Sequence, residues 1–199
     1  MKAFNGYNET KAYSNEEREQ LPKGGYVCEI KKAEVVSGKF GDQLKISLEI
    51  AEGEFKGFFE RAWRNQDRED KVWIGTYFLA VPTDDGSEKD GWAKRRFKTF
   101  TEAVEASNTG YHWDWNEAGL RGKQFGALFS IRQKEYNGSV YDNTVCSGAT
   151  SAQNIREGKY KLPKDRLIQG GSGTQQAMAT DADGFLNVGT GADEGLPFD

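Results

Sequence analysis

Two short stretches of the chain place aromatic rings among basic side chains. One is residues 58–64, Phe-Phe-Glu-Arg-Ala-Trp-Arg, and the other is residues 132–141, which contain the dipeptide Asn137-Gly138. Flat rings can stack on unpaired nucleobases, while Lys and Arg side chains pair with the phosphates of the same strand. In the alternative interpretation the rings belong to the hydrophobic core and the polar residues cover a solvated hairpin. The residues that would contact a nucleic acid are Phe58, Arg61, Trp63, Arg64, Arg132, Lys134, Tyr136 and Tyr141.

Three further groups are weaker candidates for the same kind of surface. Trp73 and Tyr77 could form a stacking ledge, although aromatic residues four apart more often belong to a core. The runs 94–96, Lys-Arg-Arg, and 159–161, Lys-Tyr-Lys, could pair with phosphates, although most charge runs are simply solvated. The predicted nucleic-acid contacts therefore also include Trp73, Tyr77, Lys159 and Tyr160.

Residues suited to catalysis or metal binding are sparse. His112 is the only histidine and no Gly-x-Ser-x-Gly motif accompanies it, which argues against a Ser-His-Asp hydrolase. Neither cysteine has a CxxC partner, so Cys28 and Cys146 are expected to be buried thiols of a reducing compartment. The acidic loop 84–90 could hold the divalent metal of a nuclease, but acidic residues favour such loops for turns and solvation alone. We expect no catalytic residue, no metal and no cofactor, and a protein that is not an enzyme.

The net charge of -4 is unevenly distributed along the chain. Five of the 31 acidic residues and none of the 27 basic residues lie in residues 169–199, so the rest of the chain carries a charge of +1. Residues 121–166 hold nine Lys and Arg against four acidic residues. This half of the body could present a basic face to a polyanion.

Hydrophobic alternation predicts several strands and one long helix. A strand over residues 26–36 changes phase part of the way along, which indicates a β-bulge. Residues 44–50 alternate strictly, residues 55–63 are predicted as a third strand, and residues 64–90 stay unassigned. The spacing of apolar residues predicts a helix over 92–107. The remaining predicted elements are a hairpin of residues 124–132 and 140–146 around the Asn-Gly turn, and a helical turn at 151–157.

Three strands, a helix and then a hairpin follow the order of an OB fold, a five-stranded barrel with a helix between strands 3 and 4. The predicted domain spans residues 21–168, after an N-terminal arm of residues 1–20. OB barrels commonly bind oligonucleotides, so we expect salt-dependent, sequence-tolerant binding of single-stranded DNA. No apolar leader or membrane span is present, which predicts a soluble cytoplasmic protein, and a homo-oligomer stays possible.

The C-terminal region has the composition of a disordered segment. Residues 169–192 are polar and glycine-rich, and they cannot bury enough apolar surface to offset the entropy of ordering. Residues 193–199, an acidic pair followed by Leu-Pro-Phe-Asp, have the form of a short recognition peptide on a tether. The residues predicted to bind a partner protein are Asp193, Glu194, Leu196, Pro197 and Phe198.

Four strings of the domain are distinctive in combination. They are Leu-Pro-Lys-Gly-Gly-Tyr-Val at 21–27, Ile-Ala-Glu-Gly-Glu-Phe-Lys-Gly at 50–57, Asn-Thr-Gly-Tyr-His-Trp at 108–113 and Ile-Arg-Glu-Gly at 155–158. Together they resemble a family of phage single-stranded DNA-binding proteins from viruses of Gram-positive bacteria. The resemblance covers residues 21–166 and implies an OB fold and a part in phage DNA replication or recombination, without assigning DNA contacts.

The last seven residues are similar to the acidic tip of bacterial single-stranded DNA-binding proteins, which recruits replication, recombination and repair enzymes. In that family the phenylalanine ends the chain, whereas Asp199 follows Phe198 here. Two other functions stay open. One is an adaptor whose barrel binds a polypeptide, and the other is a metal-dependent nuclease.

Overall fold

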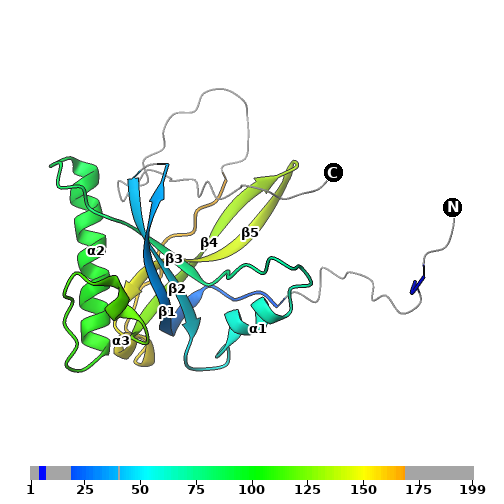
Figure 1. Ribbon diagram of the computed structural model, residues 1–199, viewed down its shortest axis with the longest axis horizontal. Coiled ribbons are helices and arrows are strands. Elements are labelled where there is room, and N and C mark those ends of the chain that lie inside the picture. The colour runs from blue at the N-terminus through cyan, green and yellow to red at the C-terminus, as the bar shows by residue number, and fades with distance from the viewer. Residues whose placement is uncertain (1–4, 8–18, 40, 169–199) are drawn as a thin grey trace.

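A computed structural model describes residues 5–7, 19–39 and 41–168 (Figure 1). Its centre is an antiparallel five-stranded sheet in the order β3-β2-β1-β4-β5, so the protein is mainly β, as predicted. The strands are β1 (Gly24–Gly38), β2 (Gly41–Ile50), β3 (Thr76–Ala80), β4 (Gln124–Tyr136) and β5 (Ser139–Thr150). The helices are α1 (Phe58–Arg64), α2 (Glu88–Ser107) and α3 (Ala152–Arg156), and α2 lies between the third and fourth strands, as predicted.

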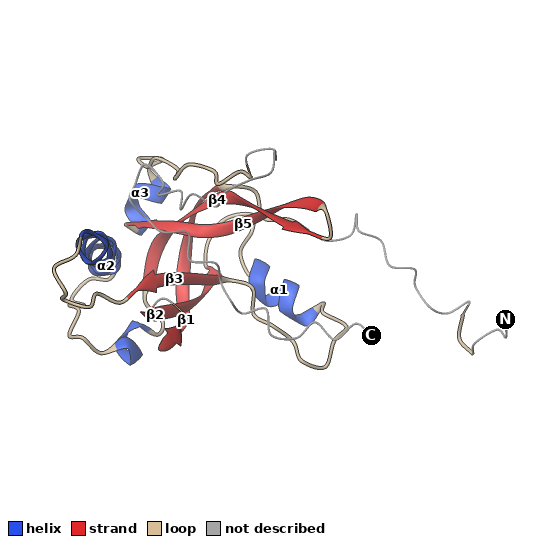
Figure 2. Ribbon diagram, turned by 90° about the horizontal axis from the view of Figure 1, so that it is seen from above, coloured by secondary structure: helices blue, strands red, loops and turns tan. Residues whose placement is uncertain are grey.

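The long first strand bends because of the predicted bulge. The register of β1 against β2 shifts between Ile30 and Lys32. Residues 24–29 of β1 pair with β4, and residues 28–38 pair with β2. The strands at the two ends of the sheet, β3 and β5, contact each other. Among the described residues no ladder of backbone hydrogen bonds joins them, so the sheet is curled but open between them (Figure 2).

The core lies inside this curled sheet. The alternating apolar residues of β2 all point inward, from Leu44 to Ile50, as their pattern predicts. Helix α2 covers one end of the core with Phe100 and Val104, and its ring-to-ring contact with Phe125 of β4 is edge-on. The predicted helix is confirmed, although it begins four residues earlier than expected, where the Ser87 hydroxyl accepts the backbone N–H of Asp90.

The predicted third strand over residues 55–63 is wrong. Residues 58–64 form α1, and the third strand of the sheet is β3, which lies in the stretch that the sequence left unassigned. Phe58 and Phe59 follow Phe55 by three and four positions, which is the spacing of neighbours on one side of a helix. Both side chains are buried in α1. A strand would have placed Phe58 and Phe59 on opposite faces.

The outer face of the sheet has a flat area made of glycines from three adjacent strands. A Cβ atom on Gly25 or Gly126 would lie 2.7 Å or 2.5 Å from the Ile155 side chain, and one on Gly148 would lie 3.2 Å from Pro163. We call these three glycines the glycine seat. Helix α3 confirms the predicted helical turn. This helix and the segment after it lie directly on the glycine seat, because glycines have no side chains to hold them away from the sheet.

Both cysteines are buried free thiols, as predicted. Burial raises the pKa of Cys146 to about 12 and raises that of Cys28 as well. Within the described ranges, no helix is both long and apolar enough to cross a membrane. Most of the predicted arm, the linker 169–192 and the tip 193–199 lie outside the described residues.

Candidate nucleic-acid interface

The predicted hairpin is confirmed, and it projects beyond the body of the domain (Figures 1 and 2). Asn137 and Gly138 form its turn with φ values of 50° and 73°. Positive φ at both central positions is the geometry that Asn-Gly favours and that matches the twist of the two strands. The turn therefore fixes which residues of β4 and β5 lie opposite each other.

One face of this hairpin gathers the four candidates of the second stretch. Lys134 lies directly opposite Tyr141, and opposed residues of an antiparallel pair point to the same side. Arg132 and Tyr136, two positions away from Lys134 along β4, point to that side too. We call Arg132, Lys134, Tyr136 and Tyr141 the tyrosine face.

The rings of the tyrosine face are accessible. Tyr136 is 52% and Tyr141 is 53% exposed, and neither ring stacks on or hydrogen-bonds to another part of the described chain. Lys134 is exposed and forms no ion pair within the described ranges. A parallel backbone bridge joins Arg132 to Arg166, so a second basic residue lies beside this part of β4. Two uncovered rings and nearby cations are what an unpaired strand needs for stacking and phosphate contacts.

The opposite face of the hairpin is acidic. Glu135 and Asp142 point to that side, and the Gln133 amide donates a hydrogen bond of 2.9 Å to the Asp142 carboxylate. Val140, which lies opposite Glu135, is 52% exposed. A strand of phosphates would be attracted to the tyrosine face and repelled by this one.

Helix α1 is held by a carboxylate from the neighbouring strand. Its N-cap, Gly57, has no side chain, and the buried Glu49 of β2 takes over the capping role. One Glu49 oxygen accepts the N–H groups of Ile50 at 2.8 Å and Phe59 at 3.0 Å, and the other accepts the N–H of Glu60 at 2.6 Å. Backbone N–H groups of a first helical turn have no intrahelical acceptor, so this carboxylate satisfies two of them.

The candidates of the first stretch, residues 58–64, all lie in α1, and the helix buries some of them and exposes others. Phe58 is only 3% exposed, so its ring is not accessible to a base, and we withdraw it from the interface. Trp63 is 38% exposed with the Lys71 ammonium 5.5 Å from its ring centre. Arg61 pairs with Glu19 at 3.6 Å, and Arg64 pairs with Glu60 one helical turn away.

The α1 residues and the tyrosine face lie on opposite faces of β4. Phe59 of α1 stacks on Phe129, with ring centres 6.1 Å apart. Phe129 is an odd-numbered residue of β4, whereas Arg132 and Lys134 are even-numbered and point the other way. One straight segment of nucleic acid could therefore not touch both groups.

The predicted ledge of Trp73 and Tyr77 is not available either. Tyr77 is 2% exposed, and burial raises the pKa of its hydroxyl. Trp73 is half-buried, and its indole N–H donates to the carbonyl oxygens of Leu48 at 3.1 Å and Gly75 at 3.0 Å. Both residues hold β3 against the core, so we withdraw them as well.

The basic run 94–96 is occupied by contacts within the protein. Lys94 pairs with Asp84 and with Asp90, which raises the pKa of Lys94. The guanidinium of Arg95 lies 4.4 Å from the Trp92 ring centre, and Arg96 donates to the carbonyl oxygen of Ser147 at 3.1 Å. These contacts stabilise the position of α2.

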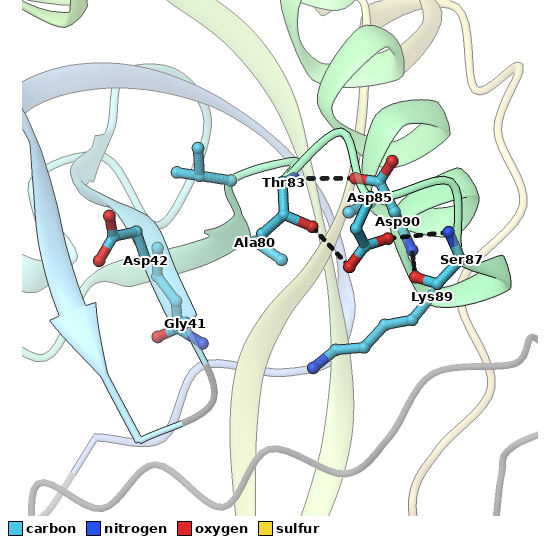
Figure 3. A pocket seen from close by; sticks show the side chains of 11 residues that line it. Gly41, Asp42, Ala80, Thr83, Asp85, Ser87, Lys89 and Asp90 are labelled. Atoms are coloured by element: carbon cyan, nitrogen blue, oxygen red, sulfur yellow. Dashed lines mark hydrogen bonds between the residues drawn. The ribbon is translucent and has the colours of Figure 1, made fainter.

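Asp90 organises the acidic loop that precedes α2. Its Oδ1 accepts the backbone N–H groups of Thr83 at 2.8 Å and Asp84 at 3.1 Å, and Thr83 and Asp90 both line a pocket (Figure 3). The hydrogen bond from Lys94 lowers the pKa of Asp90, so this carboxylate is ionised and already paired. Among the described residues, no three His, Cys, Asp or Glu side chains are placed to hold a metal ion.

Two residues that the sequence did not single out lie on the outer face of the middle strands. Phe78 of β3 is opposite Lys45 of β2, and both are partly exposed. Recognition of residues 76–80 as a strand would have identified them, because alternation with the buried Tyr77 and Leu79 turns Phe78 outward. Trp115 is also exposed, at 79%, and its ring stacks on Phe97 of α2.

Comparison with known proteins gives no assignment. No protein-family model matches the chain, and no curated protein matches it significantly.

Proposed function

We propose that this protein binds single-stranded DNA without reading its sequence, through an OB-type barrel, and that it is not an enzyme. An OB barrel is a five-stranded, partly open Greek-key barrel. Support for this fold comes from the curled five-stranded sheet, the contact between its end strands β3 and β5, and the position of α2 between β3 and β4.

The tyrosine face is the observation that carries the proposal. Stacking of one base on an aromatic side chain is worth about 1–3 kcal/mol, so Tyr136 and Tyr141 together could supply about 2–6 kcal/mol. Arg132 and Lys134 add phosphate contacts whose strength falls with salt. Rings and cations of this kind accept any base, which agrees with binding that tolerates all sequences.

A part in phage DNA replication or recombination is proposed from the resemblance to phage single-stranded DNA-binding proteins. In that role the protein covers exposed single strands in the host cytoplasm, and its last seven residues recruit replication and repair proteins. Removal of residues 193–199 should leave DNA affinity equal or higher while abolishing capture of the host repair proteins. Unchanged capture would refute the recruiting role.

Fluorescence-anisotropy titration of labelled oligo-dT tests the binding proposal. We expect binding at low salt that weakens as salt rises, much weaker binding to duplex DNA, and a loss of about tenfold or more in Tyr136→Ala/Tyr141→Ala. Val140→Ala is the matched control, because Val140 is as exposed as its neighbour Tyr141 but lies on the acidic face. Equal affinity for duplex, or no salt-sensitive binding, would favour the adaptor function instead.

A further inference from the structure

The tyrosine face continues along β4 toward the body of the domain. Leu128, like Lys134, is an even-numbered residue of β4 and points to the same face. Leu128 lies between Gly25 of β1 and Gly148 of β5, its two cross-strand partners. The tyrosine face and the glycine seat therefore lie on the same side of the sheet, and Leu128, which is only 7% exposed, lies in the part that the segment after α3 covers.

The segment after α3 places a third tyrosine on this surface. A Cβ atom on Gly25 would lie 2.7 Å from the Tyr160 ring, and one on Gly148 would lie 3.2 Å from Pro163. Tyr160 thus lies against Gly25 of the glycine seat, while 37% of the residue stays exposed. It is held on the same side of the sheet as Tyr136 and Tyr141.

Three lysines lie close to this third tyrosine in the sequence. Lys159, Lys161 and Lys164 are all exposed. Lys159 pairs with Glu157 at 2.7 Å, whereas Lys161 and Lys164 form no ion pair within the described ranges. The carboxylate of Asp165 is itself neutralised by Lys23 at 2.6 Å, so it does not offset them.

We propose that one DNA strand follows this face from the hairpin to residues 159–164, with bases stacked at both ends of the path. The proposal rests on the proposed function and extends it. Residues 128–136 of β4 span about 26 Å at the usual rise of a strand. That length accommodates about eight nucleotides of a stacked single strand and fewer of an extended one. The α1 residues, on the opposite face of β4, take no part.

Salt dependence measured over a length series separates the two ends of the path. Each phosphate contact on a single strand contributes about 0.7 to the slope of log affinity against log salt. For dT12, Lys161→Gln/Lys164→Gln should lower the slope by about 1.4, while for dT4 bound at the hairpin the slope should stay unchanged. The matched control is Arg64→Gln/Lys71→Gln, which removes the same charge from the opposite face and should leave both slopes unchanged.

The outcomes distinguish this path from DNA binding itself. If the Lys161/Lys164 variant keeps the full slope for dT12 while Tyr136→Ala/Tyr141→Ala loses affinity, the path is wrong and the proposed function stands. A reduced slope in the Arg64/Lys71 variant instead would place the strand on the other face and also overturn the path. If the unaltered protein fails to bind dT12 at low salt, the proposed function itself fails.

Discussion

The role of the Glu49 carboxylate in capping α1 leads to a prediction that tests the structure independently of DNA binding. In Glu49→Gln the side chain keeps its shape, and its remaining oxygen can still accept two of the three N–H groups. The new NH₂ group faces the N–H of Glu60, which the lost oxygen accepts at 2.6 Å. Two donors then face each other in a site where Glu49 is only 8% exposed.

The expected loss of stability follows from these contacts. A hydrogen bond to a charged group contributes about 1.5–3 kcal/mol, and an unsatisfied buried donor costs about 1–3 kcal/mol. Glu49→Gln removes one hydrogen bond to a charged acceptor, and the other two hydrogen bonds then go to a neutral acceptor. We therefore expect the substitution to destabilise the protein by about 3 kcal/mol. For a chain of this length that corresponds to a melting temperature lower by about 6–12 °C.

Thermal unfolding followed by circular dichroism measures this effect. The control is Glu34→Gln, which makes the same chemical change at a partly exposed carboxylate paired with Lys32 and Lys45. Surface pairs contribute little, so the control should melt within about 2 °C of the unaltered protein. If Glu49→Gln melts with the control, the carboxylate does not hold α1 and our account of this helix is wrong.

Three further predictions concern stability and reactivity. Because burial raises the pKa values of Cys28 and Cys146, both thiols should resist a thiol reagent such as Ellman's reagent at neutral pH until the protein is unfolded, and rapid labelling of the native protein would contradict this. Gly138→Ala forces a residue with a Cβ atom into a φ of 73°, so it should destabilise the hairpin by about 1 kcal/mol, measurable as faster amide exchange in β4 and β5. The hydrogen bond from Lys23 lowers the pKa of Asp165 below its ordinary value of 3.8, so the stabilisation is present above that value and is lost as the pH falls through the lowered pKa. Asp165→Asn should therefore show a weaker loss of stability than the unaltered protein in an acid titration, and parallel titration curves would refute this role.

Local patterns were enough to predict several elements of the fold. Strict alternation in β2, the phase change in β1 and the Asn-Gly turn are set by neighbouring residues, and the structure confirms all three. The two-residue turn even determines that Lys134 and Tyr141 share a face, because it fixes the register of the hairpin.

The failures involve partners that are distant in sequence. Aromatic residues favour strands, but residues 58–64 become a helix because Glu49, ten positions before Phe59, caps its first turn. Burial of Phe58 and Tyr77 likewise depends on how α1 and β3 pack on the core, which no local pattern specifies. The sequence therefore identified ring-bearing segments correctly but could not decide which rings face the solvent.

The glycine seat has a consequence for where the autonomous folding unit ends. The last strand ends at Thr150, yet the side chains that lie closest to the bare backbone of Gly25, Gly126 and Gly148 are those of Ile155, Tyr160 and Pro163, which come later in the chain. A chain truncated after β5 would leave this backbone and the apolar side chain of Leu128 open to proteases and to other molecules. The shortest fragment that keeps the native fold should therefore extend through the contacts of Arg166 with β4.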